Sequence, residues 1–259
     1  MTDAFYVPDG DRFVPSDLTR GPWSPEAQHA GPSAALLGRA IERLDPPGMG
    51  VARFTMEVLR PIPISPARVE ARVDRPGRRV QHAVAVLADD DGPIASASAW
   101  RILAGESEPV DLEATPHPGP GAAEQLPPFA PYEGESYFTA MEWRPAAGSL
   151  LEPGPAAVWM RMRHPLLPGE EPSSLTRVLI VADSGNGISW VLPLDRWLFI
   201  NTELTVHLAR MPEGEWVCLD ARTRVGPEGM GFAESDLWDQ RGRIGRGAQS
   251  LLVAPRQKE

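Results

Sequence analysis

The chain has 259 residues, of which 42% are hydrophobic, and its 35 acidic and 25 basic residues give a formal net charge of −10. This length fits one large domain or two small ones, and the acidic balance argues against general binding to nucleic acids or to membrane surfaces. The single cysteine, Cys218, excludes an internal disulfide, and its place in the apolar segment WVCLDA predicts a core residue. No apolar run approaches the roughly 18 residues of a membrane-spanning helix, and no signal segment leads the chain, so we expect a cytoplasmic protein.

The first half of the chain predicts a hairpin, one helix and four strands. Two short apolar pieces within residues 4–14 are broken by Pro8, Asp9 and Gly10, as in a hairpin. Residues 31–44, GPSAALLGRAIERL, have a proline near the start and then apolar side chains at helical spacing, which predicts a helix. The strand-like runs that follow are residues 51–59, 67–73, 79–88 and 93–103.

Residues 105–131 are rich in proline, glycine and acidic residues, which predicts a linker. Beyond them the pattern restarts, with a second helix at residues 175–183. The tripeptide PSS at residues 172–174 supplies a start and cap for this helix, and Gly185 and Gly187 supply a left-handed stop. The strands predicted in this half are residues 137–144, 156–163, 198–209, 215–225, 231–239 and 244–253.

The second half repeats the order of elements of the first. At a constant offset of 150 residues, Thr55, Arg60, Arg72 and Gly92 fall on Thr205, Arg210, Arg222 and Gly242. An antiparallel sheet with one helix across its face is an α+β arrangement, and two copies in one chain predict a pseudo-dimer. We therefore expect an N-terminal unit over residues 1–104, the linker over 105–131 and a C-terminal unit over 132–259.

The second predicted helix ends in a carboxylate, that of Asp183. Its preceding residues are apolar on nearly every face, so the helix is expected to be buried all round. Desolvation and the negative end of the helix dipole both favour the neutral acid, which would raise the pKa of Asp183 toward that of a useful general base. The alternative is a solvated helix end with no chemical role.

Several motifs, in this order and spacing, resemble a known family. They are HAGPSAALLGRA, EVLRPIPISP, RPGRRV, ADSGNG, FINTELTVHLAR and GAQSLLVAPR. The chain resembles the acyl-CoA thioesterases of the double hotdog type, the acyl-CoA thioesterase II group, over nearly its whole length apart from the proline-rich linker. The resemblance implies two antiparallel sheets that each wrap a central helix and join into one pseudo-dimeric sheet, and hydrolysis of an acyl-CoA with no cofactor.

The resemblance also implies site residues. In this family a water molecule attacks the thioester carbonyl, held by an Asp, a Thr or Asn, and a Gln, and these roles fall on Asp183, Asn201 and Gln249. Better-known members carry Thr where Asn201 stands, so Thr202 and Thr205 remain alternatives, and Asn201 could instead cap a turn. The residues expected to contact the substrate are His29, Gly31, Thr202 and Gly185; a loop histidine such as His29 could also be merely exposed.

The first half does not repeat this set of polar residues. Gly38 or Arg39 stands where the second helix has Asp183, and Ser98 or Ala99 stands where the last strand has Gln249. We therefore expect one working site and one vestigial site, with Asp183 facing Gln249 across a pocket. Four tryptophans surround the second helix in sequence and either line an acyl pocket or fill the core: Trp143, Trp159, Trp190 and Trp197.

Two other function classes stay open. One is a non-catalytic protein that binds acyl thioesters, and the other is a hotdog hydratase or dehydratase, which would need an Asp–His pair near the central helix. The sequence shows no histidine beside Asp183, which disfavours the second. Phosphate-loop, HExxH, CxxC and GxSxG patterns are absent, and the five histidines lack metal-ligand spacing.

The charge distribution and the pattern of strands predict what the chain binds. The basic stretch RVDRPGRR at residues 72–79 is either a solvated turn or a contact for the phosphates of coenzyme A. Edge strands in each half invite pairing between two chains, so we expect a homodimer that binds an acyl-CoA but neither nucleic acid nor a membrane.

Overall fold

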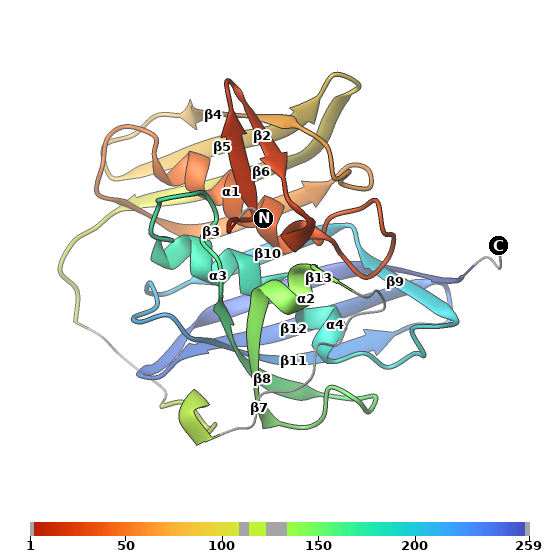
Figure 1. The fold of residues 1–259 in the computed structure, drawn as a ribbon. Helices are drawn as coiled ribbons and strands as arrows, with labels where there is room; N and C mark the ends of the chain where they lie inside the picture. Colours follow the sequence, from red (N-terminus) through yellow and green to blue (C-terminus); the bar gives the residue numbers. More distant parts are fainter. Residues whose placement is uncertain (1–2, 109–113, 123–133, 257–259) are drawn as a thin grey trace.

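One antiparallel sheet organises the molecule in the computed structural model, which describes residues 3–108, 114–122 and 134–256 (Figure 1). The elements of the first half are β1 (Tyr6–Asp9), β2 (Arg12–Pro15), η1 (Asp17–Thr19), α1 (Ala30–Glu42), β3 (Met49–Val58), β4 (Ala67–Arg75), β5 (Val80–Asp89) and β6 (Gly92–Leu103). Those of the second half are η2 (Pro120–Ala122), α2 (Tyr137–Ala140), β7 (Met141–Ala147), β8 (Ala156–Met162), α3 (Ser174–Ala182), α4 (Gly185–Ile188), β9 (Trp197–Asn201), β10 (Glu203–Leu208), β11 (Val217–Val225), β12 (Met230–Asp239) and β13 (Gly242–Pro255).

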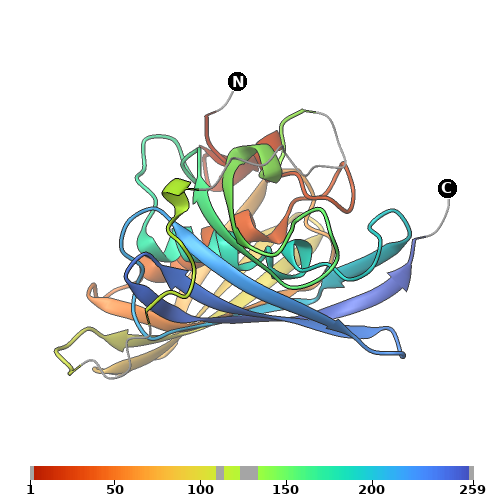
Figure 2. The ribbon, with the colours of Figure 1, turned by 90° about the horizontal axis from the view of Figure 1, so that it is seen from below.

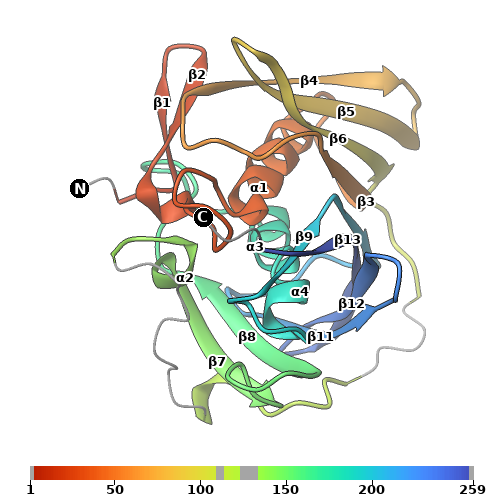
Figure 3. The ribbon, with the colours of Figure 1, turned by 90° about the vertical axis from the view of Figure 1, so that its right-hand side faces the viewer.

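The sheet has 13 strands in the order β1-β2-β4-β5-β6-β3-β10-β13-β12-β11-β8-β7, with β9 paired to the far end of β13. The two halves join where β3 pairs antiparallel with β10. The helices lie on one side of the curved sheet (Figure 2), with α1 inside the half formed by β1 to β6 and α3 and α4 inside the other half (Figure 3). This confirms the predicted α+β double hotdog. None of the helices in the described ranges could span a membrane.

One pair of residues related by the predicted 150-residue repeat lies at the junction of the two halves. Thr55 and Thr205 are register partners in the β3–β10 pairing, and the Thr205 hydroxyl donates to Thr55 Oγ1 at 3.2 Å. A local two-fold axis therefore passes between Thr55 and Thr205, and the other pairs of this junction lie symmetrically on either side of it. The offset lets positions on β3 to β6 be compared with their counterparts on β9 to β13.

An arginine on each side of the junction repeats the same contacts. The Arg60 guanidinium bonds Asp89 at 2.5 Å and the Gly92 carbonyl at 3.3 Å. The Arg210 guanidinium bonds Asp239 at 2.5 and 2.6 Å, and the carbonyl of the corresponding glycine, Gly242, at 3.0 Å. Both pairs fix the turn that leads into the last strand of their half.

The two central helices lie side by side and antiparallel, and glycine permits their close approach. A Cβ on Gly31 would lie 2.4 Å from the Ile180 carbonyl oxygen, so only glycine lets the start of α1 touch the end of α3. At the other end, the Ser173 hydroxyl accepts the Thr176 N–H at 3.1 Å, as the predicted cap requires, and donates to the Glu42 carboxylate at 2.6 Å. Each helix therefore begins where the other ends.

Three predictions about local structure were wrong. Residues 137–144 do not form one strand, because Ser136 and Thr139 make a reciprocal capping box that starts α2 before β7 begins. Gly185 and Gly187 are not in the left-handed region; they lie within the helical turn α4, so the second helix bends after Asp183 rather than stopping. The predicted strand at residues 198–209 is two strands, separated at Thr202.

The proline-rich linker lies partly outside the described residues, which omit 109–113 and 123–133. Its described part runs along the second half: the Trp159 indole donates to the Pro118 carbonyl at 2.7 Å, and His117 lies 2.9 Å from Asp220. The boundaries drawn at residues 104 and 132 stay predictions.

Candidate active site

Asp183 stands at the point where the two central helices meet. It follows the last residue of α3, and its side chain is only 2% exposed. Because the helices are antiparallel, its carboxylate lies at the start of α1 and accepts hydrogen bonds from the backbone N–H groups of Gly31 and Ala30. The close contact at Gly31 therefore brings a carboxylate of one half to a helix N-terminus of the other.

Two side-chain amides from the sheet reach the same carboxylate oxygen. Asn201, the last residue of β9, donates to Asp183 Oδ1 at 2.9 Å, and Gln249 on β13 donates to it at 3.2 Å. Gln249 also donates to the Asp183 carbonyl at 2.9 Å and accepts the Asn186 N–H at 3.1 Å, so it ties the sheet to the bend between α3 and α4. Gly185 has no room for a side chain, since a Cβ there would lie 2.9 Å from Gln249 Oε1.

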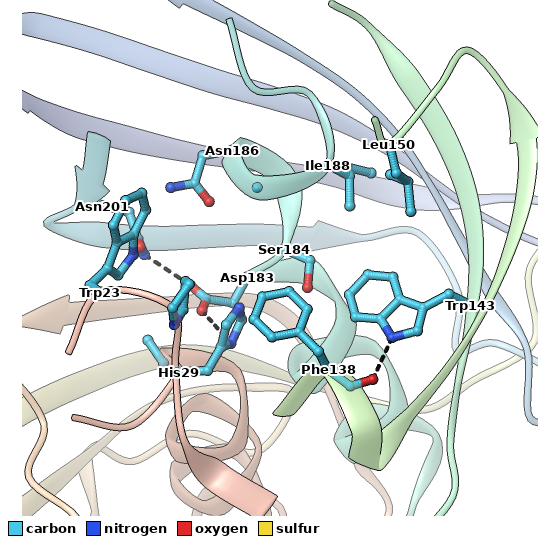
Figure 4. Close-up of a pocket in the computed structure, with 13 residues that line it drawn as sticks. Trp23, His29, Phe138, Trp143, Leu150, Asp183, Ser184, Asn186, Ile188 and Asn201 are labelled. Atoms are coloured by element: carbon cyan, nitrogen blue, oxygen red, sulfur yellow. Dashed lines mark hydrogen bonds and ion pairs between the residues drawn. The ribbon is translucent and has the colours of Figure 1, made fainter. Parts of the chain in front are cut away.

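A histidine from the first half completes the group. His29 precedes α1, accepts the Gly31 N–H at 3.1 Å, and places its Nδ1 atom 3.0 Å from Asp183 Oδ2 (Figure 4). Its ring stacks on that of Tyr137, with centroids 3.7 Å apart and planes 8° from parallel. The Tyr137 hydroxyl in turn donates to the Ile180 carbonyl at 2.8 Å.

The statement that no histidine lies beside Asp183 was therefore wrong. His29 and Asp183 are 154 residues apart in sequence, so spacing along one helix could not reveal the contact. A usable signal was present, because His29 precedes a predicted helix and Asp183 ends another. Antiparallel packing of the two helices joins those positions.

Burial sets the protonation of this pair. Desolvation raises the pKa of Asp183 to about 7, although the hydrogen bonds from Asn201, Gly31, Gln249 and Ala30 favour the carboxylate and limit the rise. Desolvation also lowers the pKa of His29 to about 3, so its imidazole is neutral. Asp183 can therefore gain and lose a proton near neutral pH. This agrees with the expectation that burial raises its pKa toward that of a useful general base.

Asp183 opens onto a small, mostly apolar cavity of about 50 Å³. The residues that line this cavity are Pro22, Trp23, His29, Ala30, Phe138, Trp143, Leu150, Asp183, Ser184, Asn186, Gly187, Ile188 and Asn201. Of the predicted substrate contacts, only His29 lines it. Gly31 and Gly185 lie beside Asp183 at the close approaches described above. Gln249 is also absent from the lining and supports Asp183 from the side of the sheet.

The alternatives to Asn201 point elsewhere. The side chain of Thr202 is exposed and donates to the Ser250 carbonyl at 3.4 Å, so it does not reach the cavity. Thr205 bonds the Glu203 carboxylate and Thr55. Within the described ranges, no three His, Cys, Asp or Glu side chains gather as a metal site would require.

The other end of the helix pair lacks these amides. Under the 150-residue offset, Val51 stands at the position of Asn201 and Ala99 at that of Gln249. Glu42 lies there beside Ser173, and Arg39 binds Glu170 through two bonds of 2.6 Å. Only the end with Asp183 combines a buried carboxylate with two amide donors.

Residues 19–102 match the family model of the acyl-CoA thioesterase N-terminal domain, and residues 109–253 match that of the acyl-CoA thioesterase C-terminal domain. The chain belongs to the acyl-CoA thioesterase family. It is accordingly a thioester hydrolase, and both matched domains come from the family that the motifs resemble. No curated protein matches the chain in sequence.

Solved structures share the fold of this acyl-CoA thioesterase. A protein from Thermobifida fusca YX proposed to be a thioesterase II superposes with a TM-score of 0.76 at 18% identity, covering 96% of this chain and 95% of that one. A proposed thioesterase from Novosphingobium aromaticivorans gives 0.73 at 20% identity, with 96% and 98% covered. An acyl-CoA thioesterase II from Mycobacterium marinum gives 0.67 at 14% identity, with 97% and 94% covered.

Proposed function

We propose that this thioesterase hydrolyses acyl-CoA with a water molecule activated by Asp183. The observation that carries the proposal is a buried carboxylate of pKa about 7 that opens onto an apolar cavity and is held by two amides. Thioester hydrolysis needs a base that is partly ionised at neutral pH and an apolar space for the acyl group. The described part of the chain supplies both at this one point.

The proposed reaction has two proton transfers. Asp183 takes a proton from water as the oxygen attacks the thioester carbonyl, and the tetrahedral intermediate then expels the thiolate, which takes the proton back from Asp183. The products are a free acid and coenzyme A. Attack and collapse both depend on a carboxyl group that changes protonation easily, which a pKa of about 7 allows.

Asn201 is proposed to orient the attacking water. Its two amide hydrogens are used, one on Asp183 Oδ1 at 2.9 Å and one on the Glu203 carbonyl at 3.3 Å. Its Oδ1 atom receives no hydrogen bond from the described residues, and the residue lines the cavity. This oxygen can accept one hydrogen of a water molecule whose other hydrogen points at Asp183.

Gln249 is proposed to position Asp183. Both hydrogens of its amide are used on Asp183, and its oxygen accepts the Asn186 N–H. The side chain therefore fixes the carboxylate relative to the bend between α3 and α4. In this arrangement Gln249 acts through Asp183 and does not itself contact the substrate.

The His29–Asp183 pair favours a second candidate, an acyl-CoA hydratase or dehydratase. Such an enzyme needs an acid and a base on the two reacting carbons of the substrate. Here His29 Nδ1 and Asp183 Oδ2 are only 3.0 Å apart, which leaves no space for a substrate carbon between them. The direct contact supports hydrolysis, in which one base acts on one water molecule.

Thiol release from a panel of acyl-CoA substrates tests the proposal. We expect release by the wild type, loss of release in Asp183→Ala, and normal release in Cys218→Ala, because burial raises the pKa of the Cys218 thiol and keeps it inert. Full activity in Asp183→Ala would exclude the proposed base. Binding of acyl-CoA without turnover by the wild type would indicate a non-catalytic protein, and hydration of a 2-enoyl-CoA would indicate the hydratase.

A homodimer is proposed as the working assembly. Two cross-strand apolar pairs related by the 150-residue offset are exposed on the sheet, Val80 with Ile102 and Met230 with Leu252. A self-complementary interface would cover both. Sedimentation of the wild type and of Leu252→Asp tests this, and a monomeric wild type would contradict it. The cytoplasmic location stays a prediction from the sequence.

A further inference from the structure

The cavity beside Asp183 has a mouth and a closed end. Trp23 at one end is half-buried, whereas Trp143, Leu150 and Ile188 at the other end are buried (Figure 4). Asp183 and Asn201 lie between the two ends. Coenzyme A is too large and polar to enter the closed end, so a thioester carbonyl placed at Asp183 must direct its acyl group toward Trp143.

The closed end is held by hydrogen bonds as well as by packing. The rings of Phe138 and Trp143 stack with centroids 5.8 Å apart and planes at 19°. The Trp143 indole donates to the Phe138 carbonyl at 2.9 Å, and the Trp190 indole donates to the Leu150 carbonyl at 3.1 Å. An acyl chain that extended past this end would have to displace Trp143 and Leu150, which these hydrogen bonds hold in place.

The space inside this boundary is small. An apolar cavity of roughly 150 Å³ holds benzene, which has six carbons. The cavity beside Asp183 measures about 50 Å³, which at the same density accommodates roughly two carbons. We allow about one or two further carbons for small side-chain adjustments that leave the Phe138–Trp143 pair in place.

We propose that the enzyme acts on short acyl groups, of about two to four carbons, and that Trp143 sets this limit. The proposal rests on the hydrolase function proposed above and adds the substrate class. Leu150 and Ile188 line the same end of the cavity as Trp143 (Figure 4). An acyl chain of eight carbons has no space between Asp183 and this wall.

Rates of thiol release from straight-chain acyl-CoA substrates of two to twelve carbons test the limit. We expect kcat/KM to be highest at two to four carbons and at least tenfold lower from eight carbons upward. A profile that is flat or rises toward twelve carbons would overturn the proposed limit and leave hydrolysis intact. Absence of release with every substrate would instead contradict the hydrolase function.

Trp143→Ala tests whether this residue is the boundary. We expect its kcat/KM for octanoyl-CoA, divided by that for butyryl-CoA, to rise at least tenfold over the wild-type ratio. Trp238→Ala is the matched control, because Trp238 is 6% exposed against 7% for Trp143 but packs in a separate cluster with Trp159 and Cys218. An unchanged ratio in Trp143→Ala, or an equal rise in Trp238→Ala, would overturn the assignment.

A substitution that removes fewer atoms tests the same boundary if Trp143→Ala does not fold. Leu150→Ala removes fewer atoms from the same closed end and should raise the same ratio by a smaller factor, about threefold. Its folding is checked by thermal unfolding before the assay. A folded Leu150→Ala enzyme with the wild-type ratio would contradict a boundary at this end of the cavity.

Discussion

His29 Nδ1 lies 3.0 Å from Asp183 Oδ2, so the residue that precedes one central helix touches the residue that ends the other. The contact exists because α1 and α3 are antiparallel and Gly31 lets them approach. It joins the two halves of the chain at the candidate base, and the protonation of Asp183 therefore depends on groups from both halves.

Asp183→Asn should lose activity and gain stability. The amide cannot take a proton from water, so we expect kcat to fall by about 100-fold or more. The amide resembles the protonated acid: its oxygen can accept from Asn201 and Gln249, and its nitrogen can donate to His29. We expect a higher Tm at pH 8, because the variant no longer buries a charge. Asp195→Asn, at an exposed carboxylate, should change neither property.

The stability that Asp183→Asn gains over the wild type should increase as the pH rises. The pKa of Asp183 is about 7 in the folded protein and near its ordinary value of 3.8 when unfolded. The native state therefore holds this proton more tightly, and its contribution to the free energy of unfolding is lost as pH rises through about 7. The Tm of Asp183→Asn should exceed that of the wild type at pH 8 and match it near pH 4. A constant difference would mean that burial does not shift this pKa.

Activity should rise with pH and level off above about pH 7. Asp183 must be ionised to accept a proton, so kcat/KM should follow the fraction of carboxylate, whose pKa is about 7. Initial rates between pH 5 and 9 measure this. A midpoint near pH 4 would indicate a solvated carboxylate.

His29→Phe should move that midpoint to lower pH. His29 Nδ1 accepts the Gly31 N–H and so carries no proton, and its contact with Asp183 is a hydrogen bond only when Asp183 is protonated. Loss of a bond worth about 1 kcal/mol would lower the midpoint by about 0.7 unit. Phenylalanine keeps the stack on Tyr137. His207→Phe, at an exposed site on β10, should leave the midpoint unchanged, and an upward shift in His29→Phe would put the proton on Nδ1.

The spacing of apolar residues, with the proline and glycine residues that interrupt it, was enough to predict most elements of the fold. The helix predicted at 31–44 from its apolar spacing is α1, Ala30–Glu42, which is buried on every face over residues 31–38. The offset that relates Thr55 to Thr205 was visible in sequence and marks the junction of the two halves. The contact between Asp183 and Gln249 followed from the family resemblance, since neither residue's neighbours reveal it.

What the sequence did not reveal depends on contacts between distant segments. The bend at Gly185 follows from the approach of Gln249, which lies on β13, and a glycine pattern alone cannot separate a bend from a stop. The His29–Asp183 contact required the relative direction of two helices. The proposed acyl limit required Trp143 and Ile188 to lie at the same end of one cavity, although they are 45 residues apart in sequence.

Gly31→Ala and Gly38→Ala should differ although both lie on the face of α1 that touches α3. A Cβ at Gly31 meets a backbone oxygen, that of Ile180, at 2.4 Å, whereas a Cβ at Gly38 meets the flexible Leu179 side chain at 2.3 Å. We expect Gly31→Ala to destabilise by about 2 kcal/mol or more, as overpacked sites do, and to lower kcat because α1 shifts from Asp183. In Gly38→Ala the clash is partly offset by the helix propensity of alanine, about 1 kcal/mol. Denaturant unfolding and thiol release measure both effects, and equal losses would contradict the role given to Gly31.

Arg210→Ala should cost more stability than Arg60→Ala, although the two arginines are related by the repeat. Arg210 binds both oxygens of Asp239, whose side chain is 0% exposed, whereas Arg60 makes one bond to Asp89, which is 12% exposed. Removal of one partner leaves a buried charge, which costs about 3–5 kcal/mol when burial is complete and less where water can enter. We expect about 3 kcal/mol for Arg210→Ala and about 1 kcal/mol for Arg60→Ala, measured by denaturant unfolding. Equal losses would mean that the two halves hold their turns equally well, and that the deeper burial of Asp239 has no energetic consequence.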